Sequence, residues 1–525
     1  MALLIYPEFS PYSFWNYKEV CRLVGAKYPA APLGLITLAA LLPESWQMKL
    51  VDMNTTELRD SDIDEADLVF IGGMLPQQAN FLRLIDRVHG RGKKVVAGGP
   101  DPTSQPEIYR RSDYLVLGEV EDSIASFLKD LESGVERGVY LPGETRPDMT
   151  RSPVPRFDLL DLKAYLMIGI QVTRGCPFNC EFCDIIELYG RVPRLKTPEQ
   201  VVAELDALYT LRYRGLVDLV DDNFIGNKRQ IKEVLRAVGE WSAARGYPFF
   251  FCTQASINIA DDEELLDLMR DVDFRYVFIG IESADEEVLA FTKKSTNLRR
   301  AISEDLLELY QHGIVVNGGF IIGFDGETPA SARSIRDTID RGRICMAMIG
   351  LLYALPGTQL TRRLAREGRL FEKESRMGPG DDTAIDQTTS GLNFVTKRDR
   401  AEIYEDYKYV LNQVYAPKSY FDRSMRLCRV LNRKAKHKLS WPEKLRAARA
   451  FIRLVLKLGL KPVTAYYFWR NIILTLLLHP SSVEELANLM AMYIHFRKQT
   501  DNTLKTTASL SRTQPGVSRQ ASLAP

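Results

Sequence analysis

The chain has 525 residues, more than a single hydrophobic core usually organises, so its length predicts several domains. Its 69 Lys and Arg balance 68 Asp and Glu to a formal net charge of +1, which gives no overall reason to expect nucleic acid as a partner. The seven cysteines are an odd number and four of them are scattered, which disfavours a disulfide framework and favours a reducing cytoplasm. No uninterrupted apolar run reaches the roughly 18 residues that a membrane-spanning helix needs.

The first 135 residues alternate short apolar runs with helix-like segments. Such alternation, with apolar strands that are continuous, is typical of an α/β fold with a doubly wound, Rossmann-like parallel sheet. In these sheets, ligands bind beyond the carboxyl ends of the strands. The expected strands are residues 3–6, 49–52, 68–72, 94–97 and 114–117.

A proline-rich linker is expected at residues 136–165, and a second strand–helix series follows at 166–372. Six strands suit a partial (βα)6 barrel better than a closed barrel of eight, and functional residues should again follow the strands. The expected strands are residues 168–172, 216–220, 249–253, 276–280, 314–322 and 348–353.

Residues 373–505 are predicted to form a helical C-terminal domain. Arg449, Arg453, Lys457 and Lys461 recur every four residues and predict a basic stripe along a helix. The last segment, 506–525, has few large apolar side chains and is predicted to be disordered.

Three cysteines, Cys176, Cys180 and Cys183, lie within eight residues, in a loop that follows an expected strand. A structural zinc site would need a fourth Cys or His, and the sequence offers none nearby. A [4Fe–4S] cluster held by three thiolates leaves one iron open. The spacing therefore favours a cluster whose fourth ligand is a substrate or cosubstrate.

This motif, C-x3-C-x2-C after Arg174-Gly175 and with Phe182 before the last cysteine, resembles that of the radical S-adenosylmethionine (SAM) family. The resemblance covers residues of about 160–370. It implies that SAM binds the open iron, and that one electron from the cluster cleaves SAM to a 5′-deoxyadenosyl radical.

The resemblance also implies which side chains bind SAM. These are Phe182 in the motif and four polar residues at the ends of the barrel strands: Asp222, Gln254, Ser256 and Glu282. Asp222 would receive the methionine ammonium in a charge-assisted hydrogen bond, and Glu282 would accept from the ribose hydroxyls. The structural alternative for each acid is a helix N-cap, because turns from strand to helix favour acids there.

The first domain resembles the cobalamin-binding domain of cobalamin-dependent radical SAM enzymes, as in "PLGLITLAALLP", "GGMLPQQ" and "VVAGGPDPTSQPE". Five turn residues would then line the corrin ring: Gly73, Met74, Gly98, Gly99 and Pro100. Four more would hydrogen-bond the amides or the nucleotide tail of cobalamin: Gln77, Thr103, Gly118 and Glu119. The alternative for any single glycine is that it serves only a tight turn.

One departure from many cobalamin domains concerns the histidine that binds the lower face of cobalt in an Asp-x-His-x-x-Gly motif. The only histidine in the first 135 residues is His89, in "DRVHGRG", which lacks that spacing. We therefore predict cobalt without a histidine ligand from the protein.

Together these resemblances imply a methyltransferase that uses a [4Fe–4S] cluster, SAM and cobalamin to methylate an unactivated carbon. The segments "RGCPFNCEFCDII" and "YGRVPRLKTP" are similar to those of the family branch that methylates hopanoid lipids at C-2. That branch implies a hydrophobic, triterpenoid-like substrate and an electron donor such as flavodoxin or ferredoxin.

Several alternatives remain open at the level of sequence. The same cofactors could serve a radical rearrangement or cyclisation of another small molecule. The basic C-terminal segment could serve modification of RNA, although no RNA-binding module is recognisable and nucleic acid is not expected. A sensor without catalysis is a further reading. The basic stripe beside "AYYFWRNIILTLLL" suits peripheral contact with the inner face of a membrane by a cytoplasmic protein, or else a helical lid packed on the barrel.

Overall fold

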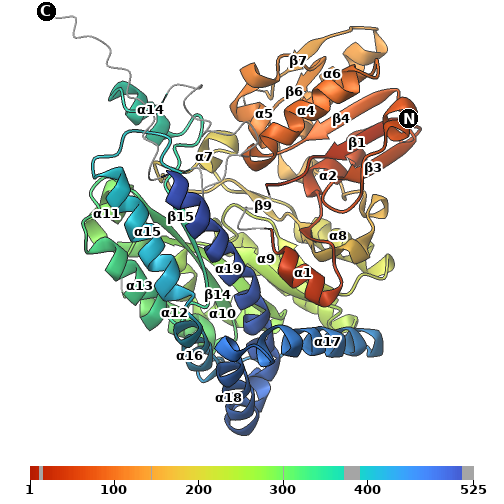
Figure 1. Cartoon of the computed structure of the whole chain (residues 1–525). Coiled ribbons are helices and arrows are strands. Elements are labelled where there is room, and N and C mark those ends of the chain that lie inside the picture. The colour runs from red at the N-terminus through yellow and green to blue at the C-terminus, as the bar shows by residue number, and fades with distance from the viewer. Residues whose placement is uncertain (11–15, 144, 299–300, 372–390, 511–525) are drawn as a thin grey trace, which may run out of the picture.

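The computed structural model describes residues 1–10, 16–143, 145–298, 301–371 and 391–510. Within these residues the chain forms two parallel sheets and a group of C-terminal helices that pack on the second sheet (Figure 1). This α/β architecture confirms the predicted fold class, a doubly wound domain followed by a partial barrel and a helical region.

The first sheet has six parallel strands with helices on both faces. Helices α2 (Leu33–Leu41) and α6 (Val120–Glu132) cover one face, and α3 (Asp60–Asp64) and α4 (Gln78–His89) cover the other. The chain reverses its direction of winding between β1 and β4, and in such sheets this switch point is where ligands bind. In spatial order the strands are β3 (Met48–Asp52), β1 (Ala2–Tyr6), β4 (Leu68–Gly72), β5 (Lys94–Gly98), β6 (Tyr114–Val116) and β7 (Gly138–Tyr140).

The second sheet has seven parallel strands, and its two edge strands do not pair with each other in the described part of the chain. It is therefore an open, partial barrel. In spatial order the strands are β15 (Met346–Leu351), β14 (Val315–Ile322), β13 (Phe274–Glu282), β12 (Phe249–Gln254), β11 (Gly215–Leu219), β8 (Tyr165–Ile170) and β2 (Tyr28–Ala30).

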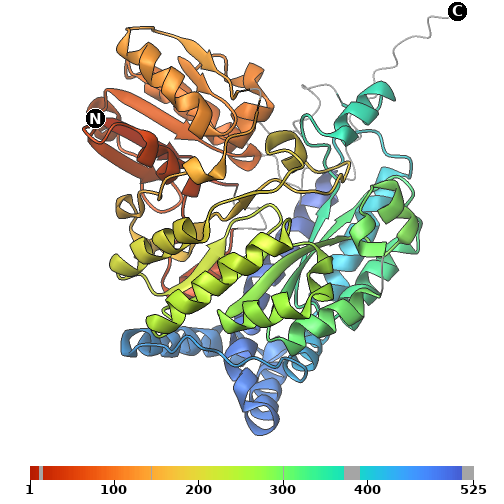
Figure 2. The ribbon, with the colours of Figure 1, turned by 180° about the vertical axis from the view of Figure 1, so that it is seen from behind.

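Helices cover the outer face of the barrel sheet, which Figure 2 brings to the front. The first of them begins where Thr197 and Gln200 cap each other, each side chain accepting the other's backbone N–H at 3.3 and 3.0 Å. The helices are α8 (Pro198–Thr210), α9 (Lys228–Ala244), α10 (Glu263–Asp271), α11 (Glu286–Phe291), α12 (Ile302–Gln311) and α13 (Ser331–Arg341).

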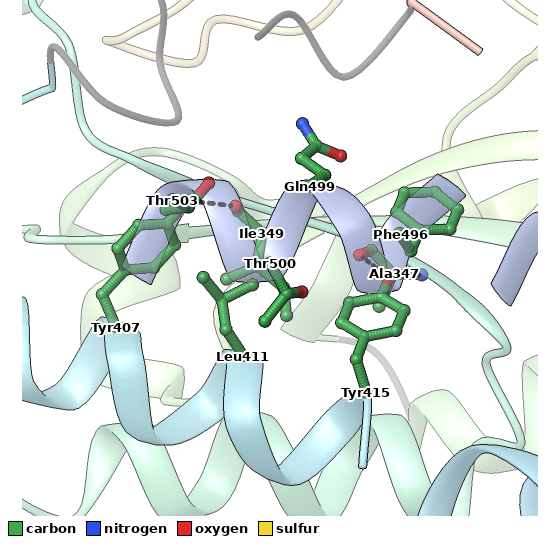
Figure 3. Close-up of a pocket in the computed structure, with 9 residues that line it drawn as sticks. All are labelled: Ala347, Ile349, Tyr407, Leu411, Tyr415, Phe496, Gln499, Thr500 and Thr503. Atoms are coloured by element: carbon green, nitrogen blue, oxygen red, sulfur yellow. Dashed lines mark hydrogen bonds between the residues drawn. The ribbon is translucent and has the colours of Figure 1, made fainter. Parts of the chain in front are cut away.

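The edge strand β15 is closed by tyrosines from helix α15 (Arg400–Val414) and its C-cap. The Tyr407 hydroxyl donates to the Ile349 carbonyl at 3.1 Å, and the Tyr415 hydroxyl donates to the Ala347 carbonyl (Figure 3). These bonds occupy backbone groups that an exposed edge would offer to another strand. The cavity between α15, β15 and α19 has a volume of about 10 Å³, room for one water molecule at most, so it is no ligand site.

The C-terminal helices share one hydrophobic core with the barrel. Helix α19 crosses in front of the sheet and packs against α1 at one edge and α15 at the other (Figure 1). Its Phe496 ring stacks on Tyr415 at 5.2 Å and meets the edge of the Tyr17 ring at 6.5 Å. Besides α15, these helices are α14 (Gln359–Arg366), α16 (Pro417–Cys428), α17 (Trp441–Leu454), α18 (Pro462–Leu478) and α19 (Val483–Leu510), and α1 (Lys18–Val24) of the N-terminal segment packs against them.

Three predicted segments differ from the structure. The expected linker at 136–165 contains β7, which extends the first sheet. The N-terminal segment with α1 and β2 lies on the barrel, where β2 pairs with β8. The expected disordered tail at 506–525 begins inside α19, which runs to Leu510, and residues 511–525 lie outside the described part of the chain. The beginning of the predicted helical domain, residues 373–390, also lies outside it.

Candidate functional site

The three cysteines lie on a loop that follows the two-residue strand β9 (Thr173–Arg174). Gly175 has φ of 90°, and a Cβ there would lie 3.0 Å from the carbonyl oxygens of Gly190 and Val192. Only glycine fits this close approach of two backbones. The Cys176 N–H then donates to the Gly190 carbonyl at 3.2 Å. The backbone at Gly190 and Val192 thus fixes the start of the loop that carries the three cysteines, which we call the cluster loop.

The thiols face one cation and one amide. The Asn223 amide donates to the Cys176 sulfur at 3.8 Å. Burial raises the pKa of all three thiols, and the Lys294 ammonium opposes that rise at Cys176 and Cys180. Burial alone would lower the pKa of Lys294, but Glu282 and the three sulfur atoms raise it above its usual value. Lys294 therefore stays charged and favours thiolates.

The donor set fits an iron–sulfur cluster better than a single metal ion. Within the described ranges, no group of three or more His, Cys, Asp or Glu side chains converges on one ion. In a [4Fe–4S] cluster each thiolate binds a different iron, so Cys176, Cys180 and Cys183 need not converge. Three soft sulfur ligands beside a cation are the donors that such a cluster takes.

Two adjacent acids after β11 hold the cluster loop. One oxygen of Asp221 accepts the backbone N–H groups of Val172 and Thr173 at 2.8 and 2.9 Å. Asp222 accepts the N–H of Gly175 at 2.8 Å. Burial raises the pKa of Asp221 to about 8 and that of Asp222 to about 6. Helix α9 is capped instead by Asn227, so the N-cap alternative is wrong for Asp222.

Glu282, the last residue of β13, has a backbone conformation that is unusual for a residue with a side chain. Its φ is 65°, and its carboxylate lies over Gly280, where any Cβ would collide with it. The carboxylate is 3.5 Å from the Lys294 ammonium. Burial raises the pKa of Glu282, and Lys294 opposes the rise. Asp285 caps the following helix, so Glu282 is not an N-cap, and strain of this kind concentrates at functional sites.

The other predicted SAM residues lie around the same strand ends. The Ser256 N–H donates to the Asn223 side chain at 3.1 Å, which links Ser256 to the amide that contacts Cys176. Gln254 is the half-buried last residue of β12. The ring of Phe182 packs 5.5 Å from Phe324, in the turn that follows β14. The structure thus brings all five predicted residues to one end of the barrel; their contacts with SAM stay a prediction.

The predicted cobalamin residues gather at the carboxyl edge of the first sheet. Pro100 opens the short helix α5 (Pro100–Ser104), and Gly98 ends β5. Gly99 has φ of 100°, and a Cβ there would lie 2.9 Å from the carbonyl oxygen of Gly73. Met74, in the facing turn, is partly exposed. The turn at Gly73 and the turn at Gly99 therefore contact each other through their backbones, without side chains between them.

Two polar side chains from the same set bond within the domain. Gln77 accepts the Met74 N–H at 2.9 Å and donates to the Pro7 carbonyl at 2.7 Å, across the switch point. Thr103 donates to the Gly99 carbonyl at 2.8 Å and accepts the Gly118 N–H at 2.9 Å. Both side chains shape the turns, and their contacts with cobalamin stay a prediction.

Glu119 joins the first domain to the cluster loop, a role that sequence reasoning missed. Its buried carboxylate lies 2.9 Å from Arg174 and 2.8 Å from Arg194, and Arg174 also lies 2.8 Å from Glu121. We call Glu119, Glu121, Arg174 and Arg194 the interdomain ion cluster. Arg174 directly precedes Gly175, so the interdomain ion cluster ties the end of β6 to the loop that carries the three cysteines.

His89 lies far from the carboxyl edge of the first sheet. It ends α4, which runs from the carboxyl end of β4 back to the start of β5, and so it lies at the opposite edge of the sheet. Its imidazole lies 2.9 Å from the Asp113 carboxylate, which also accepts the Val95 N–H. His89 thus lies away from the residues predicted to bind cobalamin, and cobalt without a histidine ligand stays a prediction.

Comparison with known proteins gives two family matches. A model described as the radical SAM superfamily matches residues 170–339, and one described as a domain of unknown function matches residues 358–508. An uncharacterized methyltransferase of Synechocystis is 40% identical over 498 residues, which cover 94% of this chain and 91% of that protein. The hopanoid C-2 methylase of Rhodopseudomonas palustris is 35% identical over 427 residues, covering 80% and 78%.

Two solved structures share the fold. The cobalamin-dependent radical SAM enzyme OxsB, with aqua-cobalamin bound, aligns with a TM-score of 0.59 and 16% identity over 98% of this chain and 82% of its own. The radical SAM methyltransferase TsrM of Kitasatospora setae, with cobalamin and a [4Fe–4S] cluster, aligns with a TM-score of 0.56 and 18% identity over 72% and 79%. At these identities, both comparisons show a shared fold, that is, the same arrangement of helices and strands.

Proposed function

The chain belongs to the cobalamin-dependent radical SAM enzymes, and on that premise we propose that it methylates an unactivated carbon of a hydrophobic substrate, C-2 of a hopanoid. As a member of this family it uses a [4Fe–4S] cluster, SAM and cobalamin. Bound together, these cofactors supply hydrogen abstraction from a C–H bond and methyl transfer to the same carbon. A saturated carbon needs both, because it has no lone pair with which to attack SAM.

One observation carries the proposal: the cluster loop and the carboxyl edge of the first sheet meet through the interdomain ion cluster. Arg174 precedes the loop and Glu119 follows β6, so the expected cobalamin edge and the expected iron site face each other. Asp222 and Glu282 supply buried carboxylates beside the loop, suited to an ammonium and to ribose hydroxyls.

The substrate rests on similarity along the chain. The hopanoid C-2 methylase matches 80% of this chain, more than the barrel alone could supply. We therefore expect a triterpenoid-like substrate and an electron donor such as flavodoxin or ferredoxin. None of the helices within the described ranges has the length and apolar character to span a membrane. A substrate of this kind resides in lipid, so we propose peripheral contact with the inner face of a membrane.

The test uses anaerobically reconstituted full-length protein, a hopanoid that lacks the C-2 methyl group, and SAM with a deuterated methyl group. We expect a hopanoid that carries the labelled methyl, with deoxyadenosine and S-adenosylhomocysteine in equal amounts. Cys183→Ala should abolish the labelled hopanoid and the deoxyadenosine, and the matched control Cys21→Ala, at a buried cysteine in α1, should keep them.

Other outcomes separate the parts of the proposal. Deoxyadenosine without S-adenosylhomocysteine would contradict methylation and support rearrangement or cyclisation. Labelled methyl on another lipid, with the hopanoid unchanged, would contradict only the substrate. Fewer than about four irons per chain would contradict the cluster itself.

A further inference from the structure

Helices α17 and α18 carry an apolar surface that the protein does not cover. Of the 23 exposed large apolar side chains in the described residues, 13 lie between Trp441 and Leu478. Single exposed apolar residues are ordinary, but a concentration of this kind marks a binding surface. We call the exposed apolar side chains of the two helices and of the turn between them the α17–α18 surface.

On α17 the apolar residues point away from the molecule. Trp441, Leu445 and Ile452 lie within about 40° of one another at about 100° per residue. Their exposures are 79%, 47% and 59%. The buried Leu454 lies on the opposite side of the helix. A surface helix of a soluble protein shows the reverse pattern, with apolar residues inward and polar residues outward.

Helix α18 repeats the pattern. Tyr466, Ile473 and Leu477 share one side and are exposed by 68%, 53% and 73%, whereas Phe468 and Asn471 on the opposite side are buried. Helix α18 packs through that buried side on α16 and α19. The reading of this segment as a lid whose apolar face packs on the barrel is therefore wrong for most of its large apolar side chains.

The charge of α17 and α18 is almost entirely positive, and the one acid in these helices is Glu443, which caps the start of α17. Residues 444–478 contain seven Lys or Arg and no Asp or Glu. Three of the cations bond within the protein; Lys457, for example, lies 2.9 Å from Glu19. The other four, Lys444, Arg446, Arg449 and Lys461, are exposed and form no ion pair in the described part of the chain. Arg449 adjoins the apolar stripe of α17.

We propose that the α17–α18 surface docks on an anionic lipid bilayer. Exposed Trp and Leu side chains flanked by unpaired cations are the features of helices that lie in the interface of a membrane. Both views place α17 and α18 at the end of the molecule away from the first domain, so docking leaves the cluster loop uncovered (Figures 1 and 2). The proposal deepens the membrane contact suggested above, but it rests on this surface and not on the identity of the substrate.

A second copy of the chain is the other apolar partner to consider. A twofold dimer would place the surface against itself. Lys444 and Arg449 of each copy would then approach the same cations of the other, with no acid between 444 and 478 to compensate. Anionic headgroups complement that charge, whereas a second copy repels it.

The experiment is flotation of the full-length protein with vesicles of phosphatidylcholine alone or mixed with phosphatidylglycerol. We expect binding to the mixed vesicles only, and its loss in 1 M salt. Lys444→Gln with Arg449→Gln should lower the partition coefficient about 30-fold, since each cation near an anionic surface contributes a factor of about 5 to 6. Ile452→Glu with Leu477→Glu should lower it at least about tenfold.

The matched control is Leu211→Glu, an exposed leucine at the end of α8 on the outer face of the barrel, which should bind as the wild type does. Each variant should cleave SAM at the wild-type rate, which shows that it is folded. If the wild-type protein floated with neither kind of vesicle, the proposal would be overturned. It would also be overturned by a dimer, detected by light scattering, that Ile452→Glu converts to a monomer while flotation is unchanged. Failure of hopanoid methylation, with flotation intact, would leave the docking surface established.

Discussion

Glu119→Gln should weaken the junction between the two sheets because it unbalances buried charge. The interdomain ion cluster holds two acids and two arginines, so it is neutral. The side chains are exposed by 1% at Glu119, 3% at Glu121, 10% at Arg174 and 16% at Arg194. Removal of one partner from a buried ion pair costs about 3–5 kcal/mol, because a charge is left uncompensated. Arg194 keeps the Pro147 and Tyr189 carbonyls at 2.7 and 3.0 Å, so we expect about 3 kcal/mol.

A double-mutant cycle tests this reasoning. Arg194→Met should also cost about 3 kcal/mol, since it leaves the cluster with one negative charge in excess. The double variant restores neutrality, because Arg174 and Glu121 still pair at 2.8 Å. Its loss of stability should therefore be smaller than the sum of the single losses by about 2 kcal/mol. Glu136→Gln, whose carboxylate is 84% exposed beside Lys94, serves as the control and should change stability by less than about 0.5 kcal/mol.

The assay is urea unfolding of the full chain, followed by tryptophan fluorescence and by circular dichroism. Losses that add to within about 0.5 kcal/mol would refute the coupling. Cobalamin retention gives a second readout. If Glu119 acts through the junction, Glu119→Gln and Arg194→Met should lower retention alike; if it bonds the corrin amides, only Glu119→Gln should do so.

Three further predictions concern other parts of the two sheets. Burial raises the pKa of Glu327 from 4.5 to about 7. Because folding then takes up a proton, the contribution of this carboxyl to wild-type stability should fall by roughly 3 kcal/mol as pH rises from about 4.5 to about 7. Glu327→Gln should remove this part of the pH dependence of unfolding, and equal slopes would contradict it. Gly99→Ala should lower cobalamin retention through a clash with the Gly73 backbone, whereas Gly92→Ala, also at positive φ but with open space around it, should not. Bound Co(II) should show no nitrogen superhyperfine splitting from a histidine imidazole in its electron paramagnetic resonance spectrum, since His89 lies at the opposite edge of the sheet.

The predicted elements that the structure confirms have strong local signals. The apolar runs predicted as strands at 68–72 and 94–97 are strands in the structure, as β4 and β5. A strand that is buried on both faces has a continuous apolar sequence, which is recognisable without knowledge of its neighbours. The cluster loop was evident from cysteine spacing. Both signals lie within a few neighbouring residues.

The features that sequence reasoning missed depend on contacts distant in sequence. Strand β2 has three residues with a proline in the middle, and it becomes a strand only through its pairing with β8. Lys294 and Arg174 carry no local mark of their contacts with Glu282 and Glu119. The spacing of cations every four residues predicted a helix with one basic face in the segment of α17. The spacing did not indicate which face of the helix would pack against the rest of the protein. Such facts follow from tertiary structure alone.

The path of the chain holds the two sheets together, and with them the two proposed cofactor sites. After β1 the chain leaves the first sheet, forms α1 and β2 on the barrel, and returns through α2 to β3. It crosses again after β7, so the sheets are joined by more than one linker. The Tyr165 hydroxyl of β8 donates to the Asp52 carboxylate of β3 at 2.9 Å in a buried contact, and the interdomain ion cluster forms a second bond. Separation of the sheets would expose both contacts, at a cost of several kcal/mol for the ion cluster alone. The proposed reaction, in which hydrogen is removed from one substrate carbon and a methyl group is then added to it, needs this fixed geometry, because small errors of position cost rate steeply.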